Sequence, residues 1–413
     1  MERLLERCAA LDVHQASVSA CVRVPGEGDQ RREFNERFGA TTPDLLALCD
    51  WLRGHGVTHV AMEGTGVYWK PVYYALEGEF ELLLVNAAHV KQVPGRKTDT
   101  KDAAWLCQLL ECGLLRASFV PPKPIRELRD LTRYRKTLIA DRASEANRLH
   151  KVLEDAGVKL SSVASNVLGV SGRLMLEALC QGDNDPVALA ELARGRLRSK
   201  LPALRRALES HFRDHHAFLV AQILGHLDYL DEAIAACSAR IDEQIAPFGS
   251  ALRLLESIPG VGRRNAEVIV AEIGADMSVF PSSRHLASWA KVSPGNNESA
   301  GKRKSGAIGK GSPWLRSALV ESALAATRTR GYLRAKYWRI RQRRGHQRAV
   351  IAVAHAILEI SYHMFQSGEL YRDLGDDFFD RRDNERATQR HLRALERLGY
   401  RVTVEAAANP QAP

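Results

Sequence analysis

Four carboxylates lie where predicted strands end or a predicted helix begins. Asp12 ends a first predicted strand, and Glu63 ends a fourth one. Asp99 and Asp102 lie three residues apart at the start of a predicted helix, a spacing that puts both on one helical face. Carboxylates this close repel unless a cation lies between them, and oxygen ligands suit Mg²⁺ or Mn²⁺. The four acids therefore predict a divalent-metal site that could clamp the attacking and leaving oxygens of a phosphodiester.

Each acid alone also has an ordinary explanation. Asp99 could cap its helix, because acids favour the first helical turn, and Asp12 and Glu63 could be loop acids. Their joint placement on a hairpin, strand, helix, strand and helix pattern is the ribonuclease H-like arrangement, which favours the metal site. A basic loop beside the acids would meet phosphates. Its cations are Lys91, Arg96 and Lys97.

A second candidate site is a glycine-containing turn between two predicted helices, within residues 254–274. Gly260 and Gly262 would let the backbone turn tightly and approach a phosphate, which the free N–H groups of the second helix could bind. The pattern predicts a helix-hairpin-helix. Because no predicted strand precedes it, it is not a dinucleotide-binding fingerprint. A structural helical turn is the alternative.

A polar loop at residues 292–306 sets hydroxyl groups among cations. A serine hydroxyl can attack phosphorus if its proton is taken up and the phosphate charge is neutralised. Lys302, Arg303 and Lys304 could supply the neutralising charge. The residues alone do not choose among the serines, each of which could instead shape a loop or cap a helix. The candidates are Ser293, Ser299, Ser305 and Ser312.

The positive charge of the chain is concentrated in one segment. Residues 301–350 contain 14 Lys and Arg and one acid, Glu321, for a local net charge of +13. Since the whole chain carries +10, the remainder sums to −3. Lys310 and Arg316 lie near the start of this basic block, and aromatic residues interleave its cations. The pattern favours nucleic-acid binding with a steep salt dependence over a solvated face that serves solubility.

The composition of the 413 residues, 45% hydrophobic and 26% charged, is typical of a globular protein with two to four domains. It excludes a mostly disordered chain, a collagen and a small disulfide scaffold. Without an apolar stretch of about 18 residues or a signal peptide, we expect no membrane span and a cytoplasmic location. Seven cysteines with no C-x-x-C pair predict reduced thiols, mostly in the core.

The predicted elements divide the chain into four regions. Residues 1–120 combine five strands with three helices in an α/β layer pattern and end at a proline-rich linker. Residues 125–245 are almost all helical, with heptad-like apolar stripes that fit an antiparallel coiled-coil hairpin, a dimerising arm or an ordinary bundle core. Residues 250–365 form another helical region. Residues 366–413 are predicted to be a charged, partly disordered tail.

These motifs together resemble the DEDD transposases of the "IS one-ten" insertion-sequence family, including its bridge-RNA-guided recombinases. The resemblance covers most of the chain in the right order, and the stretch VPGRKTDTKD at residues 93–102 is its most specific part. The other matching motifs are LDVH at 11–14, MEGTGVY at 62–68, IPGVG at 258–262, SAGK at 299–302, and KG at 310–311 with LR at 315–316.

The resemblance implies a RuvC-like N-terminal domain whose acidic tetrad, formed by the four acids above, holds Mg²⁺, with Mn²⁺ as a substitute. It implies a coiled-coil arm used in oligomerisation, to a dimer or tetramer. It also implies a C-terminal transposase domain whose serine becomes covalently joined to DNA, in a composite site with the acids across subunits. That serine maps best onto Ser299. Because Ala300 stands where the family often has glycine, Ser293 and Ser305 remain alternatives.

The family resemblance further implies a noncoding bridge RNA that pairs with donor and target DNA. The predicted activity is therefore transposition by DNA recombination, with DNA and RNA as partners and no membrane. One alternative is a metal-dependent hydrolytic nuclease or Holliday-junction resolvase, which needs the acids but no covalent intermediate. A non-enzymatic nucleic-acid-binding protein is the other alternative, and it leaves the four acids unexplained.

Overall fold

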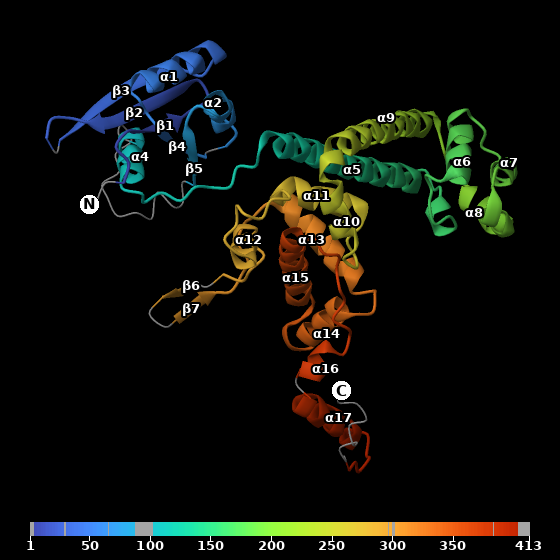
Figure 1. Ribbon diagram of the computed structural model, residues 1–413. Coiled ribbons are helices and arrows are strands. Elements are labelled where there is room, and N and C mark those ends of the chain that lie inside the picture. Colours follow the sequence, from blue (N-terminus) through green and yellow to red (C-terminus); the bar gives the residue numbers. More distant parts are fainter. Residues whose placement is uncertain are drawn as a thin grey trace. The chain divides into compact units, whose positions relative to one another are not determined.

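A computed structural model describes most of the chain, and its contacts divide it into two compact units, residues 1–120 and 121–413 (Figure 1). We describe each unit by itself. The described residues are 4–28, 30–64, 66–86, 102–295, 297–299, 302–382 and 384–403.

The first unit is built on a five-stranded mixed sheet with the strand order β3-β2-β1-β4-β5 (Figure 1). β1 pairs antiparallel with β2, and β2 with β3, as expected for consecutive strands joined by short turns. β1 pairs parallel with β4, and β4 with β5, with a helix in each connection. The strands are β1 (Cys8–Val13), β2 (Ser17–Pro25), β3 (Arg31–Gly39), β4 (His59–Glu63) and β5 (Glu81–Val85).

Helices cover both faces of this sheet. Helices α1 (Thr42–Gly54) and α2 (Trp69–Leu76) pack on one face, and α4 (Asp102–Glu111) packs on the other. Side chains alternate along a strand, so Leu11 of β1 lies in the core under α1 and α2, whereas Ala10 lies under α4. Burial on both faces explains why β1 is almost continuously apolar. The thiols predicted to be reduced are free, and five of the seven are buried.

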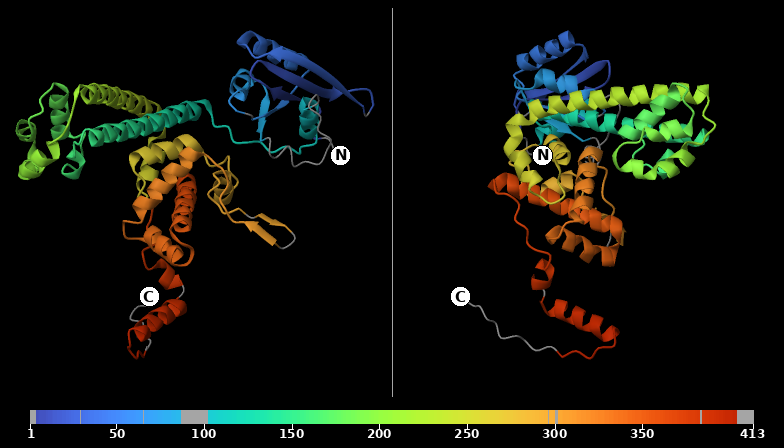
Figure 2. Two further views of the ribbon diagram at one scale, coloured as in Figure 1. Left: turned by 180° about the vertical axis from the view of Figure 1, so that it is seen from behind. Right: turned by 90° about the vertical axis from the view of Figure 1, so that its right-hand side faces the viewer.

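The second unit begins with a long antiparallel helix pair, α5 (Lys123–Asp155) and α9 (Asp214–Ile245) (Figure 2). Leu138 packs against Leu230 and Ile234 midway along the pair. Arg142, later in α5, binds Asp231 in α9 through two nitrogens. The carbonyl of Leu131, earlier in α5, lies 3.4 Å from the thiol of Cys237, later in α9, so the two helices are antiparallel. We call residues 123–245 the helical arm.

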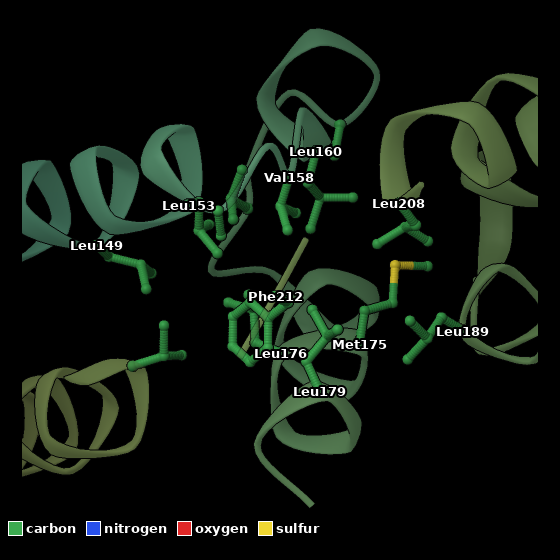
Figure 3. Close-up of a cluster of buried hydrophobic side chains, with 14 of the residues drawn as sticks. Leu149, Leu153, Val158, Leu160, Met175, Leu176, Leu179, Leu189, Leu208 and Phe212 are labelled. Carbon is green, nitrogen blue, oxygen red and sulfur yellow. The ribbon is translucent and has the colours of Figure 1, made fainter. Parts of the chain in front are cut away.

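The far end of the arm has a hydrophobic core of its own (Figure 3). Met175 and Leu176 of α6 point into it together with Leu149 and Leu153 of α5. Gly and Pro residues interrupt the helical pattern in this segment. They separate five short helices that pack around one centre. They are η1 (Leu160–Ser162), α6 (Val170–Cys180), α7 (Pro186–Glu191), η2 (Gly195–Lys200) and α8 (Leu201–Leu208).

The rest of the second unit is a helical body around α15 (His346–Ser367). By length and composition α15 is the one helix in the described residues that could cross a membrane, but 56% of its apolar window is buried inside the protein. It therefore serves as a core helix. The other elements are η3 (Ala246–Phe248), α10 (Gly249–Glu256), α11 (Arg263–Ile273), α12 (Ser283–Trp289), β6 (Asn297–Ser299), β7 (Lys302–Ser305), α13 (Pro313–Ala326), α14 (Tyr332–Arg344), α16 (Phe378–Arg382) and α17 (Asn384–Arg397).

Buried ion pairs fasten the arm to this body. Glu272 of α11 is 1% exposed and accepts two hydrogen bonds from Arg133 of α5, at 2.7 and 2.9 Å. Glu267, one turn earlier, accepts one from Arg135 at 2.5 Å. Arg129 donates to the carbonyl of Glu272 at 2.6 Å. Buried charges need such partners, and removing one member of a buried pair typically costs about 3–5 kcal/mol. These contacts therefore hold α5 against α11.

Candidate active site and nucleic-acid surface

Asp12 and Glu63 lie side by side at the ends of two neighbouring parallel strands. Leu11 of β1 is in register with Met62 of β4, and the two acids are the next residues on each strand. Because Ala10 lies under α4, the two-residue period of the strand puts Asp12 on the α4 face, and the same reasoning applies to Glu63. Both acids are half-buried.

The direction of α4 brings its first residue toward the same end of the sheet. The sulfurs of Cys107 and Cys8 are 3.8 Å apart, and the carbonyl of Glu111 accepts a hydrogen bond from the N–H of Leu4 at 2.9 Å. The last turn of α4 therefore lies at the beginning of β1. Since the helix runs antiparallel to that strand, its start at Asp102 is directed toward the end of β1 that carries the acid. Asp99 lies outside the described residues.

A histidine that sequence reasoning left without a role contacts this acidic site. The Nε2 atom of His14 lies 3.2 Å from Oδ2 of Asp12. The signal was available in the LDVH motif, because two residues separated by one lie on the same side of an extended chain. The basic loop predicted to lie beside the acids, with Lys91, Arg96 and Lys97, is outside the described residues.

The segment of Ser299 forms a two-stranded hairpin rather than the polar loop predicted from sequence. Ser299 ends β6 and pairs through its backbone with Lys302, the first residue of β7. A bridge between Pro294 and Ile308 closes the base of the hairpin. Lys302, Arg303 and Lys304 thus follow one another along β7. The hairpin was not predicted because the sequence of this segment is polar and lacks the apolar alternation that indicates a half-buried strand.

The structure separates the roles of the other serines. Ser312 is the N-cap of α13: its hydroxyl accepts from the N–H of Leu315 at 3.3 Å and donates to Glu272 at 3.0 Å. Ser305 pairs through its backbone with Asn297 in the hairpin, and Ser293 is half-buried before it.

Cations of the basic block lie near the start of α13 and along α14. Lys310 is exposed, and Arg316 donates weakly to a backbone carbonyl at 3.5 Å. Of the interleaved aromatics, Tyr337 is buried and hydrogen-bonded to His346, whereas Trp338 is 42% exposed. The guanidinium of Arg341 lies 4.6 Å from the Trp338 ring. This exposed pair combines a charge with a flat aromatic face, as nucleic-acid-binding surfaces do.

The glycine-containing turn joins α10 to α11 and gives its two glycines different surroundings. Gly260 has a φ of +91°, and a Cβ there would lie 2.4 Å from the carbonyl oxygen of Ser322 in α13. Gly262 has an ordinary φ of −86°, no neighbour within 4 Å, and is the N-cap of α11 without a side-chain cap. Gly260 is thus pressed against a helix, while Gly262 leaves the start of α11 open to a ligand.

We expect Gly260→Ala to destabilise the protein by about 2–4 kcal/mol, because alanine is strained at positive φ and its methyl group meets the α13 backbone. Gly262→Ala is the matched control and should change stability by less than about 1 kcal/mol, while weakening DNA binding if a phosphate approaches there. Urea unfolding measures the first effect and a DNA titration the second. Unfolding of the Gly260 variant at the wild-type midpoint would contradict this packing.

A cluster of Asp155, His215 and His216 has its ligand atoms within 4.8 Å of one another, in the arm rather than among the predicted acids. His216 is 1% exposed; its Nδ1 accepts the N–H of Arg213 at 3.1 Å, and its Nε2 lies 3.0 Å from Asp155. The hydrogen bond from His216 lowers the pKa of the Asp155 carboxyl. With both ring nitrogens of His216 occupied, this cluster caps α9 and joins it to α5.

Two family models match separate parts of the chain. Residues 9–157 match the model of a DEDD transposase family, described as "Transposase". Residues 252–339 match the model described as "Transposase IS116/IS110/IS902 family". The first match spans the sheet with Asp12 and Glu63, and the second spans the glycine turn, the hairpin of Ser299 and most of the basic block.

Curated relatives extend the similarity over most of the chain. The "Pilin gene-inverting protein" of Moraxella lacunata is 34% identical over 345 residues, which are 79% of this chain and 87% of that protein. The "Putative transposase y4pF/y4sB" of Sinorhizobium fredii is 27% identical over 83% of this chain and 78% of its own length. The "Insertion element IS110 uncharacterized 43.6 kDa protein" of Streptomyces coelicolor is 27% identical over 67% of this chain and 73% of its own.

The family matches and these relatives define an enzyme that acts on DNA by strand transfer. More specifically, the chain belongs to the IS116/IS110/IS902 family of transposases. Membership of a DEDD transposase family also implies the use of a divalent metal ion and DNA as the partner.

Proposed function

We propose that this protein is an insertion-sequence recombinase that cuts and rejoins DNA through a metal-binding acidic tetrad and a serine nucleophile. The observation that carries the proposal is the adjacency of Asp12 and Glu63 on parallel strands, on the sheet face where α4 begins with Asp102. Asp99 completes the proposed tetrad. The strand order, with three antiparallel strands followed by two parallel ones, supports a RuvC-like, ribonuclease H-type domain.

The donor set fits a hard divalent cation. Carboxylate oxygens are the ligands that Mg²⁺ and Mn²⁺ prefer, and two half-buried acids on adjacent strands repel each other unless a cation is shared. When bound, such an ion supplies positive charge at the scissile phosphate. In this proposal Asp12, Glu63, Asp99 and Asp102 hold the ion, and His14 orients the Asp12 carboxylate through its 3.2 Å contact.

The proposed nucleophile is the hydroxyl of Ser299. Its Oγ gives up its proton and forms a bond to phosphorus while the bond from phosphorus to the 3′ oxygen breaks, and that oxygen takes up a proton as it leaves as a 3′-hydroxyl. Lys302 and Arg303 stabilise the phosphate charge as it develops. After strand exchange, a freed 3′-hydroxyl attacks the phosphorus of the phosphoserine and releases the Ser299 hydroxyl. The position of Ser299 beside Lys302 at the end of the hairpin supports this assignment over Ser312, whose hydroxyl caps a helix.

We further propose that the α10–α11 turn works as a helix-hairpin-helix, with Gly262 near a DNA phosphate, and that the basic block contacts nucleic acid through Lys304, Lys310 and Arg316. The helical arm would act as a coiled-coil arm that joins copies into a dimer or tetramer. The acids and the serine would then meet across subunits. A noncoding bridge RNA would select donor and target DNA by base pairing.

The experiment that tests this function is capture of a covalent intermediate. The full chain is incubated with labelled DNA and RNA, both derived from the flanks of its gene, with Mg²⁺ or with EDTA, and denaturing gels report adducts. We expect an SDS-resistant protein–DNA adduct that requires both Mg²⁺ and the RNA. Metal-dependent cleavage without an adduct would instead support a hydrolytic nuclease. An adduct formed equally well without RNA would contradict the proposal that an RNA guides the reaction.

A further inference from the structure

An open basic cavity of about 870 Å³ lies at the far end of the helical arm, outside both family-model matches. Two stretches of chain line it. The first precedes and opens α6, between Val163 and Gly172, and the second contains η2, between Arg194 and Lys200. Neither stretch belongs to the acidic site, the hairpin of Ser299 or the basic block.

The walls of this cavity are fixed by hydrogen bonds between the two stretches. The hydroxyl of Ser171 in the first turn of α6 accepts the backbone N–H of Arg194 at 2.8 Å. The ammonium group of Lys200 donates to the carbonyl of Val163 at 3.1 Å. Beneath them, Leu197 packs onto the core at the end of the arm, shown in Figure 3. The cavity is therefore a built feature rather than a gap between mobile loops.

The charge of the lining has one sign. Arg194, Arg196 and Lys200 line the cavity, and within residues 102–295, all of which the structure describes, no acidic side chain does. Residues 192–208 contain six Lys and Arg and no acid. The nearby Glu191 already pairs with Arg198 and Arg205, so it does not neutralise the lining.

The start of α6 adds backbone donors to these cations. Gly169 is its N-cap and offers no side-chain cap. The N–H groups of the first turn and the positive end of the helix dipole are therefore available to a negatively charged ligand. A Cβ at Gly172 would lie 2.0 Å from the carbonyl of Val167, so glycine is needed for this turn to pack here. Three hydroxyl-bearing residues, Ser165, Ser171 and Ser199, also line the cavity.

We propose that this cavity is a second nucleic-acid site, which binds the phosphodiester backbone of DNA or RNA at the end of the arm. The lining combines the cations, hydroxyls and glycine backbone with the apolar side chains of Val163, Ala164, Val170 and Leu197. Among residues 102–295 it includes no aromatic side chain on which a base could stack, so it favours phosphate over bases. The contact would thus be independent of sequence. It would hold a nucleic acid at a distance along the arm from the body of the second unit.

The first test removes the charge. Arg194→Gln/Arg196→Gln/Lys200→Gln in the full chain is compared with Lys151→Gln/Arg206→Gln/Arg240→Gln, which removes three exposed charges elsewhere on the arm. Probes are a labelled duplex DNA and an RNA of the same sequence. We expect the cavity variant alone to bind one or both probes about 10- to 100-fold more weakly near 0.1 M salt, with a salt slope smaller by about 2–3.

A second pair of variants adds charge without removing a contact. Val170 is 74% exposed in the first turn of α6, at the cavity, and Val187 is 48% exposed in the first turn of α7, outside it. An acid is tolerated in either first turn because the helix dipole favours it. Val170→Glu should weaken binding of the same probes, whereas Val187→Glu should not.

The outcomes separate this site from the proposed recombinase. All variants are made in the Ser299→Ala background, so binding is read without catalysis. Loss with only the DNA or only the RNA probe identifies which nucleic acid occupies the arm. Equal binding by cavity and control variants would overturn the cavity proposal while leaving the recombinase intact.

Discussion

Replacing Ser299 by alanine is expected to abolish the covalent protein–DNA product and to slow strand cleavage by about 10³-fold or more, as loss of a nucleophile does in other enzymes. The physical reason is that alanine has no atom able to bond to phosphorus, whereas the charges of β7 and the acidic site remain. DNA binding should therefore change little. The measurement is the amount of SDS-resistant adduct formed with Mg²⁺, together with a binding titration of the same variant.

Two further serine variants make this prediction specific. Ser293→Ala and Ser305→Ala change hydroxyls in or before the same hairpin, and both should still form the adduct. Adduct at the wild-type level in the Ser299 variant would contradict the assignment. If the adduct disappears only in one of the other two variants, the nucleophile belongs to that serine.

Asp12→Asn is expected to reduce metal-dependent cleavage by about 10³-fold or more, because it removes one of the charges that hold the ion and stabilise the transition state. Glu63→Gln should behave in the same way, since the two acids occupy neighbouring positions on β1 and β4. Asp50→Asn is the matched control. Its carboxylate lies on the surface of α1, paired with Arg53, and is 74% exposed.

The acidic site is also tested without catalysis. Asp12→Asn should weaken Mn²⁺ binding, measured by calorimetry or by electron paramagnetic resonance, while the control binds as the wild type does. Asp12→Asn keeps the size of a half-buried side chain, so the metal-free fold should keep its stability to within about 1 kcal/mol. Cleavage that continues undiminished in EDTA would contradict a metal-dependent site.

Much of the first unit could be predicted from sequence because its signals are local. Cys8–Val13 and Glu81–Val85 are short apolar runs bounded by polar residues, and both form strands at those positions. The sequence predicts Thr42 as the N-cap of a helix, and α1 does begin at Thr42, but its N-cap is the preceding residue, Thr41, which forms a capping box with Asp44. The strand ends then brought Asp12 and Glu63 together, since neighbouring parallel strands finish at one edge.

What sequence reasoning missed depends on contacts between distant residues. The tight turn at Gly260 could be predicted, but its close approach to Ser322, 62 positions later in the chain, could not. The core at the end of the arm forms between short helices that no single periodic stripe reveals. His216 joins α9 to Asp155 at the end of α5, a contact that only the antiparallel pairing creates. Local patterns carry no information about such long-range pairs.

The shared acid at the root of the arm has a mechanical consequence. Glu272 accepts hydrogen bonds from Arg133 of the arm on one side and from the Ser312 hydroxyl on the other, where α13 starts eight residues after β7 ends. The Glu272 carboxylate therefore couples the direction of α5 to the start of α13, alongside the Arg135–Glu267 pair and the bond from Arg129 to the backbone.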